Sequence, residues 1–286
     1  MPATPSPSAR GRRLRHELRR LREEAGLTHS EVARRLEWSA SKLSRIETGQ
    51  SRVQTGDVRD LLDVYGVTDA AVCDAMVQLA REARRRGWWT RYTDVLGSGT
   101  YVGLEADASA LHTYESQFVP GLLQTEDYAR AVIRAGQARP DPETLERRLT
   151  ARMARQEILT RPDPPEIWAV LDEPVVSRPV GGAGVMRAQL QHLIEVSTRP
   201  NTPLTLQVLP LSAGAHPGMN GPFVILEFHS PTDPPMVYLE TATDGLYIEE
   251  PPDIERYTLR FNHLVARALG PDESRTMIAD IAERMA

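Results

Sequence analysis

The sequence predicts two domains, an all-α domain near the N-terminus and a larger α+β domain after it. Apolar residues recur at helical spacing and are interrupted by glycines up to residue 86, whereas five short apolar runs separated by Pro, Gly and Asp follow residue 166. With 286 residues and 41% hydrophobic content, the chain can bury a sizeable core. We expect a disordered tail over residues 1–11, a helical domain over 12–87 and an α+β domain over 88–286.

Charge is divided unevenly between these two domains. The whole chain has a net charge of −5. Residues 1–92 hold 18 Lys and Arg against 12 Asp and Glu, a net charge of +6, whereas the remainder holds 16 against 27, a net charge of −11. This asymmetry is expected when only one domain meets a polyanion such as a nucleic acid.

The single cysteine, Cys73, excludes a disulfide framework and a cysteine-based zinc cluster. We expect it to be a small buried thiol in a helix, which fits a reducing cytoplasm. The first residues, MPATPSPSARGRR, lack the apolar core of a signal peptide, and no run of about 18 apolar residues occurs. We therefore expect a cytoplasmic, nucleoid-associated protein without a membrane segment.

The first two helices are predicted from leucine spacing and a capping box. Residues 12–25 form the first helix, which stops at Gly26, a residue suited to a left-handed C-terminal position. Thr28, with Glu31 three residues later, forms the capping box of the second helix. The apolar faces of the two helices are Leu14, Leu18 and Leu21, and Val32, Ala33 and Leu36.

A third helix, over about residues 39–48, follows the turn Glu37-Trp38. Ser39 is its expected N-cap and Gly49 its end. Its buried side chains are Leu43 and Ile46, so those expected on other faces are Ala40, Ser41, Ser44 and Arg45, with Lys42 toward one flank. Three short helices with these breaks describe a helix-turn-helix.

The outer face of the third helix suits the major groove of DNA. Arg45 has a planar fork that matches O6 and N7 of guanine, the serines can contact bases or phosphates, and Ala40 can touch a thymine methyl. Lys42, the only lysine of the chain, is a flexible point charge better suited to a phosphate. The alternative is a solvated helix face with incidental charges.

The run LRRLREEAGLTHSEVARRLEWSASKLSRIETGQ, residues 18–50, resembles the helix-turn-helix of XRE-type, phage-repressor-like transcription factors. The resemblance implies base reading by Ala40, Ser41 and Arg45. The residues expected to contact phosphates, from the resemblance or from side-chain chemistry, are His29, Ser39, Lys42, Thr48, Gln50 and Arg52. Arg22 and Glu47 match a structural ion pair between the first helix and the recognition helix.

Two positions depart from this family pattern. His29 stands where glutamine is common; it either donates to a phosphate, with some pH sensitivity, or is an ordinary exposed histidine. Glu37 stands where the turn usually has glycine, so the turn is either not left-handed or carries a modest strain.

Two more helices complete the first domain, over residues 55–67, with Thr55 or Asp57 as the cap, and over 69–86. The second should bury Val72, Met76 and Leu79. The arginines at 84–86 either touch DNA flanks or end the helix and stay solvated. Trp88, Trp89 and Tyr92 are then expected to form a packing seam at the junction.

The first part of the second domain is expected to be helical. Helices are predicted over residues 103–116, from Thr125 after a turn at 119–121, and over 142–160. The long helix carries an apolar stripe of Leu145, Leu149 and Met153. Its second stripe, Arg148, Arg152 and Arg155, either binds an acidic partner or is a solvated face paired with its own glutamates.

A roughly five-stranded mixed sheet follows. Its strands are predicted by the runs IWAVLDEP, PLTLQVLP, GPFVILEF, PMVYLET and GLYIE. Helices are expected over 184–198, 252–268 and 271–285, an order of elements like that of ligand-sensing folds. The loop 212–223 is either an effector-binding loop, with His216, Gly218 and Asn220 as candidate residues, or an ordinary flexible connection.

Several runs of the second domain resemble the domain of unknown function that follows such helix-turn-helix modules in actinobacterial regulators of the WhiJ-like group. These runs are VPGLLQTEDYARAV, ARMARQEIL, GGAGVMRAQLQHLIE, LQVLPLSAGAHPGMNGPFVILEF and VYLET. The resemblance implies a cytoplasmic DNA-binding regulator, often partnered with a small protein encoded nearby.

An enzyme is the weaker alternative. The residue types for acid–base or metal chemistry occur at His112, His216, His229, Asp172, Glu173 and Glu240, but no HExxH, phosphate loop, nucleophile elbow or tight Cys/His spacing is present. We expect no catalysis, cofactor or metal. The expected function is sequence-specific transcriptional regulation by a homodimer on an inverted-repeat operator, with a second domain that senses a small molecule or protein. The alternative is an adaptor that acts mainly through a small protein partner, as in an antitoxin-like pair.

Overall fold

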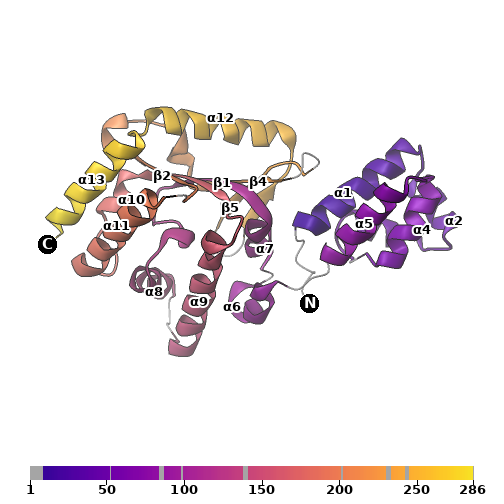
Figure 1. Ribbon diagram of the computed structural model, residues 1–286, viewed down its shortest axis with the longest axis horizontal. Helices are drawn as coiled ribbons and strands as arrows, with labels where there is room; N and C mark the ends of the chain where they lie inside the picture. Colours follow the sequence, from indigo (N-terminus) through magenta and orange to yellow (C-terminus); the bar gives the residue numbers. More distant parts are fainter. Residues whose placement is uncertain are drawn as a thin grey trace. The chain divides into compact units, whose positions relative to one another are not determined.

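The chain divides into two compact units, Met1–Asp107 and Ala108–Ala286, called unit 1 and unit 2 below (Figure 1). The computed structural model describes residues 9–51, 53–83, 87–97, 99–137, 141–200, 202–229, 233–241 and 245–285. Over these residues unit 1 contains helices alone, and unit 2 combines helices with a mixed six-stranded sheet. The predicted fold class is therefore confirmed.

Unit 1 begins with five helices. They are α1 (Ala9–Glu24), α2 (His29–Arg35), α3 (Ala40–Glu47), α4 (Thr55–Tyr65) and α5 (Ala70–Ala83). Helix α1 begins three residues before its expected start, so residues 9–11 are helical rather than part of a tail. Gly26 and Gly66, which follow α1 and α4, have positive φ angles of 68° and 75°, where glycine is favoured.

Two of these three helices, α2, α3 and α4, begin at the N-cap residue that the sequence predicted. Thr28 and Glu31 form the expected capping box: the Glu31 amide donates to the Thr28 hydroxyl at 3.3 Å, and the Thr28 amide donates to the Glu31 carboxylate at 2.8 Å. Ser39 is the N-cap of α3, although its side chain makes no capping bond. The N-cap of α4 is Gln54, whose amide donates to Asp57 at 3.1 Å, so Asp57 supports the cap from the first turn.

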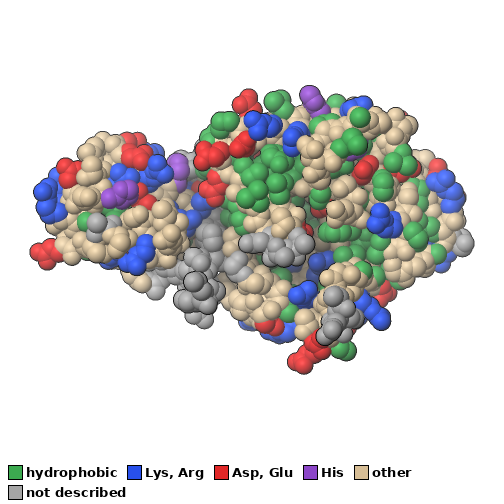
Figure 2. All heavy atoms as spheres, turned by 180° about the vertical axis from the view of Figure 1, so that it is seen from behind, with side chains coloured by type: hydrophobic (Ala, Val, Ile, Leu, Met, Phe, Trp, Pro, Cys, Tyr) green, Lys and Arg blue, Asp and Glu red, His purple; other side chains and the backbone are tan. Residues whose placement is uncertain are grey.

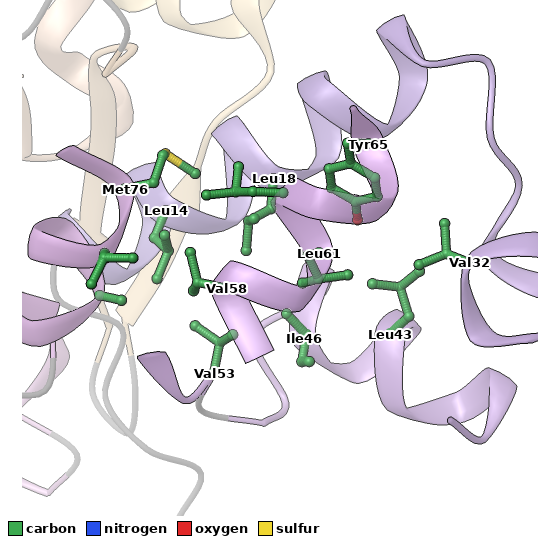
Figure 3. Close-up of a cluster of buried hydrophobic side chains, with 13 residues drawn as sticks. Leu14, Leu18, Val32, Leu43, Ile46, Val53, Val58, Leu61, Tyr65 and Met76 are labelled. Atoms are coloured by element: carbon green, nitrogen blue, oxygen red, sulfur yellow. The ribbon is translucent and has the colours of Figure 1, made fainter. Parts of the chain in front are cut away.

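The core of unit 1 forms where α1, α3, α4 and α5 meet (Figure 3). Its fully buried members include Leu14, Leu18, Leu43, Ile46, Leu61 and Leu62. The expectation for α5 is partly wrong, because Val72 is 38% exposed while Met76 is buried. Residues 73, 76, 77 and 80 share one helical stripe toward the core, and Val72 lies a step of about 100° away from it. Cys73 is partly buried in this stripe.

A 3-10 turn (Trp88–Tyr92), α6 (Thr93–Leu96) and α7 (Thr100–Asp107) complete unit 1. The Trp88 ring lies edge-on to Trp89 and Tyr92, with ring centroids 6.2 Å and 5.9 Å away. An aromatic cluster therefore forms within this unit. Because a side chain at Gly103 would meet the Trp89 ring at 3.0 Å, Trp89 packs closely on α7.

The sheet of unit 2 has the strand order β3-β2-β1-β4-β5-β6. The strands are β1 (Ala108–Glu115), β2 (Glu166–Asp172), β3 (Leu204–Leu209), β4 (Phe223–Phe228), β5 (Met236–Glu240) and β6 (Gly245–Ile248). Strands β1, β2 and β3 are parallel, and β4, β5 and β6 continue the sheet in antiparallel fashion.

The central strand β1 corrects the helix expected over 103–116. Helix α7 ends at Asp107, and the rest of the expected helix is β1. Leu111 pairs with Ile167 of β2 on one side and with Leu226 of β4 on the other. These pairing partners are distant in sequence, and such tertiary pairing overrides a local helical pattern.

Helices cover both faces of the sheet, with α12 on one face and α8, α9 and α11 on the other (Figure 1). The helices are α8 (Glu126–Ala135), α9 (Pro142–Arg155), α10 (Glu173–Ser177), α11 (Ala183–Thr198), α12 (Pro251–Arg267) and α13 (Pro271–Arg284). The helix expected over 142–160 is α-helical to Arg155 and continues as a 3-10 turn over Gln156–Thr160. The expected apolar stripe of Leu145, Leu149 and Met153 is present, and it packs on α8.

The carboxyl ends of β1, β2 and β3 meet at one edge of the sheet, called the carboxyl edge below. Strand β4 begins at the same edge, because Phe223 pairs with Tyr114 near the end of β1. The segment 210–222 therefore crosses the ends of β2 and β1 on its way from β3 to β4. Ligands of open α/β sheets commonly bind at such an edge.

None of the helices within the described ranges combines the length and apolar character that a bilayer span requires.

Candidate nucleic-acid interface

Helix α3 is anchored by two buried side chains and presents polar residues outward. Leu43 and Ile46 are 0% and 1% exposed and belong to the core. Ser41, Ser44 and Arg45 are exposed. Ala40 is the first residue of the helix, but its side chain lies outside the described part of the structure. The two polar residues that are expected to read bases, Ser41 and Arg45, therefore both face solvent.

The two cations of α3, Lys42 and Arg45, differ in their contacts. The Lys42 ammonium lies 2.7 Å from the Asp57 carboxylate of α4 and 3.5 Å from the centroid of the Trp38 ring. Arg45, in contrast, is exposed and has no acidic partner among the residues that the structure describes. Lys42 therefore holds α3 against α4, and any phosphate contact by Lys42 competes with Asp57. Arg45 is the cation of α3 that stays available.

Arg22 and Glu47 form a bidentate ion pair between α1 and α3. The two nitrogen–oxygen distances are 2.7 Å and 2.9 Å, and the side chains are only 8% and 5% exposed. Arg22 also donates to the carbonyl of Leu27 at 2.8 Å. The carboxylate raises the pKa of Arg22 through hydrogen bonding, so the pair stays charged.

His29 joins this network from the first turn of α2. Its Nε2 lies 3.0 Å from a Glu47 oxygen, while its side chain remains 43% exposed. One ring nitrogen of His29 is thus hydrogen-bonded to Glu47, so His29 is not an ordinary exposed histidine. A phosphate contact by His29 would use the other ring nitrogen or replace this bond.

The remaining residues expected at phosphates lie around the ends of α3. Ser39, Thr48 and Gln50 are exposed. The Ser39 hydroxyl is 3.2 Å from that of Ser41, and the Thr48 hydroxyl donates to the Ser44 carbonyl at 2.7 Å. Arg52 and the arginines at 84–86 lie outside the described residues.

Glu37 occupies the left-handed region, with a φ of 54°, and no other non-glycine residue in the described ranges has a positive φ. The amide of Trp38 donates to the Ala33 carbonyl at 2.8 Å, which closes α2 in a Schellman motif. Of the two alternatives for this turn, the strained one is correct. The tight turn sets the entry of α3.

In unit 2, the candidate effector residues lie on the segment that crosses the carboxyl edge. Gly218 is buried on the Tyr114 ring, which a Cβ at this position would strike. The His216 ring is 6.0 Å from that of Tyr114, and its buried Nδ1 has no hydrogen-bond partner in the described structure. Asn220 is exposed. The segment is also tied to α12, because Arg267 donates to the carbonyls of Ala213 and Ala215.

Of the residue types considered for catalysis, Asp172 and His216 both lie against Tyr114 at the carboxyl edge: the Tyr114 hydroxyl donates to Asp172 at 3.4 Å, and its ring is 6.0 Å from that of His216. His112 stacks on Phe261 of α12 at 5.1 Å, His229 lies on the surface 3.5 Å from Asp163, and Glu173 accepts from the Leu211 amide at 2.7 Å. In the described ranges, no three His, Cys, Asp or Glu residues form a group that could hold a metal ion.

The arginine stripe of α9 agrees only in part with the alternative of a solvated face. Arg148 is exposed, but Arg152 is enclosed and donates to the buried Gln124 at 3.0 Å. Burial lowers the pKa of Arg152 to about 10, and Arg155 contributes to the decrease. Sequence spacing identified the stripe, but no local pattern indicated that its middle member faces the carboxyl edge.

Comparison with known families agrees with this division of the chain. Residues 13–74 match a family described as a helix-turn-helix domain, and residues 98–280 match a domain of unknown function, DUF5753. No curated protein and no solved structure gives a significant match to the chain. The helix-turn-helix domain indicates a DNA-binding regulator. Since the second match spans well over half of its length, the chain belongs to the family defined by DUF5753, preceded by a helix-turn-helix domain.

Proposed function

We propose that this protein is a sequence-specific transcriptional regulator in which α3 reads base edges in the major groove. The observation that supports this most is that a rigidly anchored helix carries, on its exposed face, an Arg45 with no acidic partner among the described residues. Arg45 contacts guanine through its planar fork, and Ala40 and Ser41 contact neighbouring bases. Ser39, Thr48, Gln50, His29 and Arg52 contact the phosphates that fix the register.

The proposed DNA-binding form is a homodimer on an inverted repeat. One recognition helix covers only a few base pairs, so two half-sites supply the specificity that one lacks. A monomeric mass with and without DNA, together with a footprint of a single half-site, would contradict this part of the proposal.

Replacing Arg45 by alanine tests the reading role. We expect specific binding to weaken by about 1–3 kcal/mol and the preference at one base position to relax, because one bidentate contact is lost. The measurement is a binding selection from random DNA, followed by titration of the selected site. Arg81→Ala is the matched control, since it removes an exposed arginine from α5. An unchanged base preference in Arg45→Ala would remove this side chain from the readout.

Unit 2 is proposed to sense a small molecule or a protein. Hydrophobic side chains gather on the face of unit 2 drawn in Figure 2. Leu211 and Met219, both on the segment crossing the carboxyl edge, are 65% and 71% exposed, which favours a protein partner as the second candidate. An adaptor role predicts that a stoichiometric small protein co-purifies with the chain and that Leu211→Ser releases it, with DNA affinity unaffected by metabolites.

A further inference from the structure

The two outer strands of the sheet in unit 2 differ in how their backbones are bound. At β3, the Val208 amide donates to the Ser274 hydroxyl at 2.9 Å, and the Val208 carbonyl accepts from the Leu269 amide at 2.9 Å. These partners lie in α13 and just before it, so α13 closes this side of the sheet. At the other side, β6 has β5 as its only strand neighbour within the described ranges. An outer strand directs alternate amides and carbonyls away from the sheet, where a further strand can pair with them. The outer side of β6 is called the β6 edge below.

Leu246 gives the β6 edge an apolar contact. Its side chain is 54% exposed, and it pairs directly with Leu239 of β5. Leu239 is half-buried at the margin of the core that Ile254 and Phe261 of α12 help to form. Directly paired residues share one face of a sheet, so Leu246 extends this apolar face beyond the part that the core covers. A strand added at the β6 edge would place one of its own side chains beside Leu246.

Aromatic side chains hold β6 in register from the opposite face. Tyr247 pairs directly with Tyr238 of β5, and their ring centroids are 5.1 Å apart. A Cβ at Gly245 would strike the Tyr238 ring, so this ring lies across the glycine. An aromatic ring over a glycine of an outer strand stabilises the strand pair. The β6 edge is therefore formed before any partner binds, and binding does not have to order it.

The segment around β6 is strongly acidic. Residues 236–255 contain six Asp and Glu and no Lys, Arg or His. Glu249 and Glu250, which directly follow β6, are exposed and have no ion-pair partner among the described residues. Carboxylates at the end of an outer strand favour a partner that carries positive charge. A second copy of this chain would bring two such acidic segments together, and like charges side by side disfavour that pairing.

We propose that the β6 edge binds an extended segment of another protein, in which apolar side chains alternate along the strand and Lys or Arg lies at its ends. Backbone hydrogen bonds add this segment to the sheet as a further strand. Its apolar side chains pack against Leu246, and its cations pair with Glu249 and Glu250.

This surface names the partner chemistry for the proposed sensing role of unit 2, on which its biological use rests. Its binding test requires no DNA. Binding of the segment without any effect on DNA affinity would refute the sensing role and leave the β6 edge as a binding surface, so the two failures are distinguishable.

Selection from a library of short random peptides on the full-length protein tests this surface. We expect the enriched peptides to alternate apolar with other residues and to carry Lys or Arg. The peptide enriched most is then synthesised and titrated. Leu246→Lys should weaken its binding about 10-fold or more, because an apolar contact is replaced by a like charge. Leu259→Lys is the matched control, since Leu259 of α12 is also 54% exposed, and it should leave binding unchanged.

Two further measurements separate strand addition from general stickiness. N-methylation of the peptide at two successive central positions should abolish binding at one position only, because alternate amides bond to β6. Glu249→Gln should weaken binding about 3-fold and reduce its dependence on salt, because one exposed ion pair is lost. The control Glu283→Gln removes an exposed carboxylate of α13, the helix that closes the β3 side, and should change neither.

Several results would overturn the proposal. These are a library without enriched peptides, enriched peptides that are acidic or do not alternate, equal losses in Leu246→Lys and Leu259→Lys, and equal tolerance of both N-methylations. If the peptide-free chain is a dimer that Leu246→Lys dissociates, the occupant of the β6 edge is a second copy and the proposed partner is wrong.

Discussion

At the scale of single residues, Glu37 has a side chain at a backbone position whose conformation favours glycine. Its left-handed φ of 54° is a conformation in which a side chain is disfavoured by about 1–2 kcal/mol. The resemblance to the family identified this position, because glycine is usual there. It left open whether the backbone at Glu37 is left-handed.

Glu37→Gly should therefore stabilise unit 1 by about 0.5–1 kcal/mol, since relief of strain exceeds the entropy that glycine adds to the unfolded chain. Urea unfolding of the full-length protein measures this change. Arg34→Gly, at an exposed position inside α2, is the matched control and should be destabilising by about 0.5–1 kcal/mol. A loss of stability in Glu37→Gly would show that the side chain has a compensating contact.

Lys42 marks the limit of residue-level prediction in the candidate site. The buried face of α3 follows from Leu43 and Ile46 alone, so the exposure of Ser41 and Arg45 was predictable. The bond from Lys42 to Asp57 was not, because it depends on how α4 packs beside α3. The same holds for Arg152, whose bond to Gln124 depends on how α9 packs in unit 2.

At the scale of elements, the Arg22–Glu47 pair fixes the position of α3 relative to α1. The resemblance to the family predicted these partners, and the structure adds His29 of α2 to the same carboxylate. The Glu47 carboxylate of α3 thus binds Arg22 of α1 and His29 of α2, and this one buried group links the three helices.

Glu47→Ala should destabilise unit 1 by about 3–5 kcal/mol, because it leaves the buried Arg22 charge without its partner. Chemical denaturation with a probe in unit 1 reports the loss. The exposed pair of Arg20 and Glu24 provides the contrast, and Glu24→Ala should cost about 1 kcal/mol or less. Similar losses in both variants would mean that the Glu47 pair acts as an ordinary surface contact.

The elements of unit 2 were predictable where their ends carry chemical signals. Thr125 is the N-cap residue of α8, as expected, although its side chain makes no capping bond, and the five expected strands are present. Strand β1 was missed because ASALHTYE has neither a strict alternation nor flanking turn residues on both sides. Its state is decided by two neighbours that lie far along the chain.

At the scale of the whole molecule, we expect the two units to divide recognition and regulation. A fragment of residues 1–107 should select the same base sequence as the full chain, because the negatively charged remainder repels phosphate on average. The fragment must include α7, since Arg10 lies 3.5 Å from Asp107 and Trp89 packs at Gly103. Selection from random DNA compares the two proteins.

The complementary fragment, residues 108–286, serves as the control and should bind no specific DNA. A folded 1–107 fragment with a different base preference, or specific binding by 108–286, would contradict the division. Weaker binding by 1–107 with the same preference would place dimer contacts in unit 2.

The central position of β1 has a consequence for how the protein is made. Strand β1 leaves the ribosome before every other strand, yet its β4 neighbour ends only at Phe228. Until then one edge of β1 stays open to pairing with other chains, a situation that favours aggregation. Unit 1 is complete long before and can fold during this interval. Synthesis that stops between β3 and β4 would therefore release a chain with a finished helix-turn-helix and an open sheet edge. Chaperone dependence is then expected to arise from unit 2.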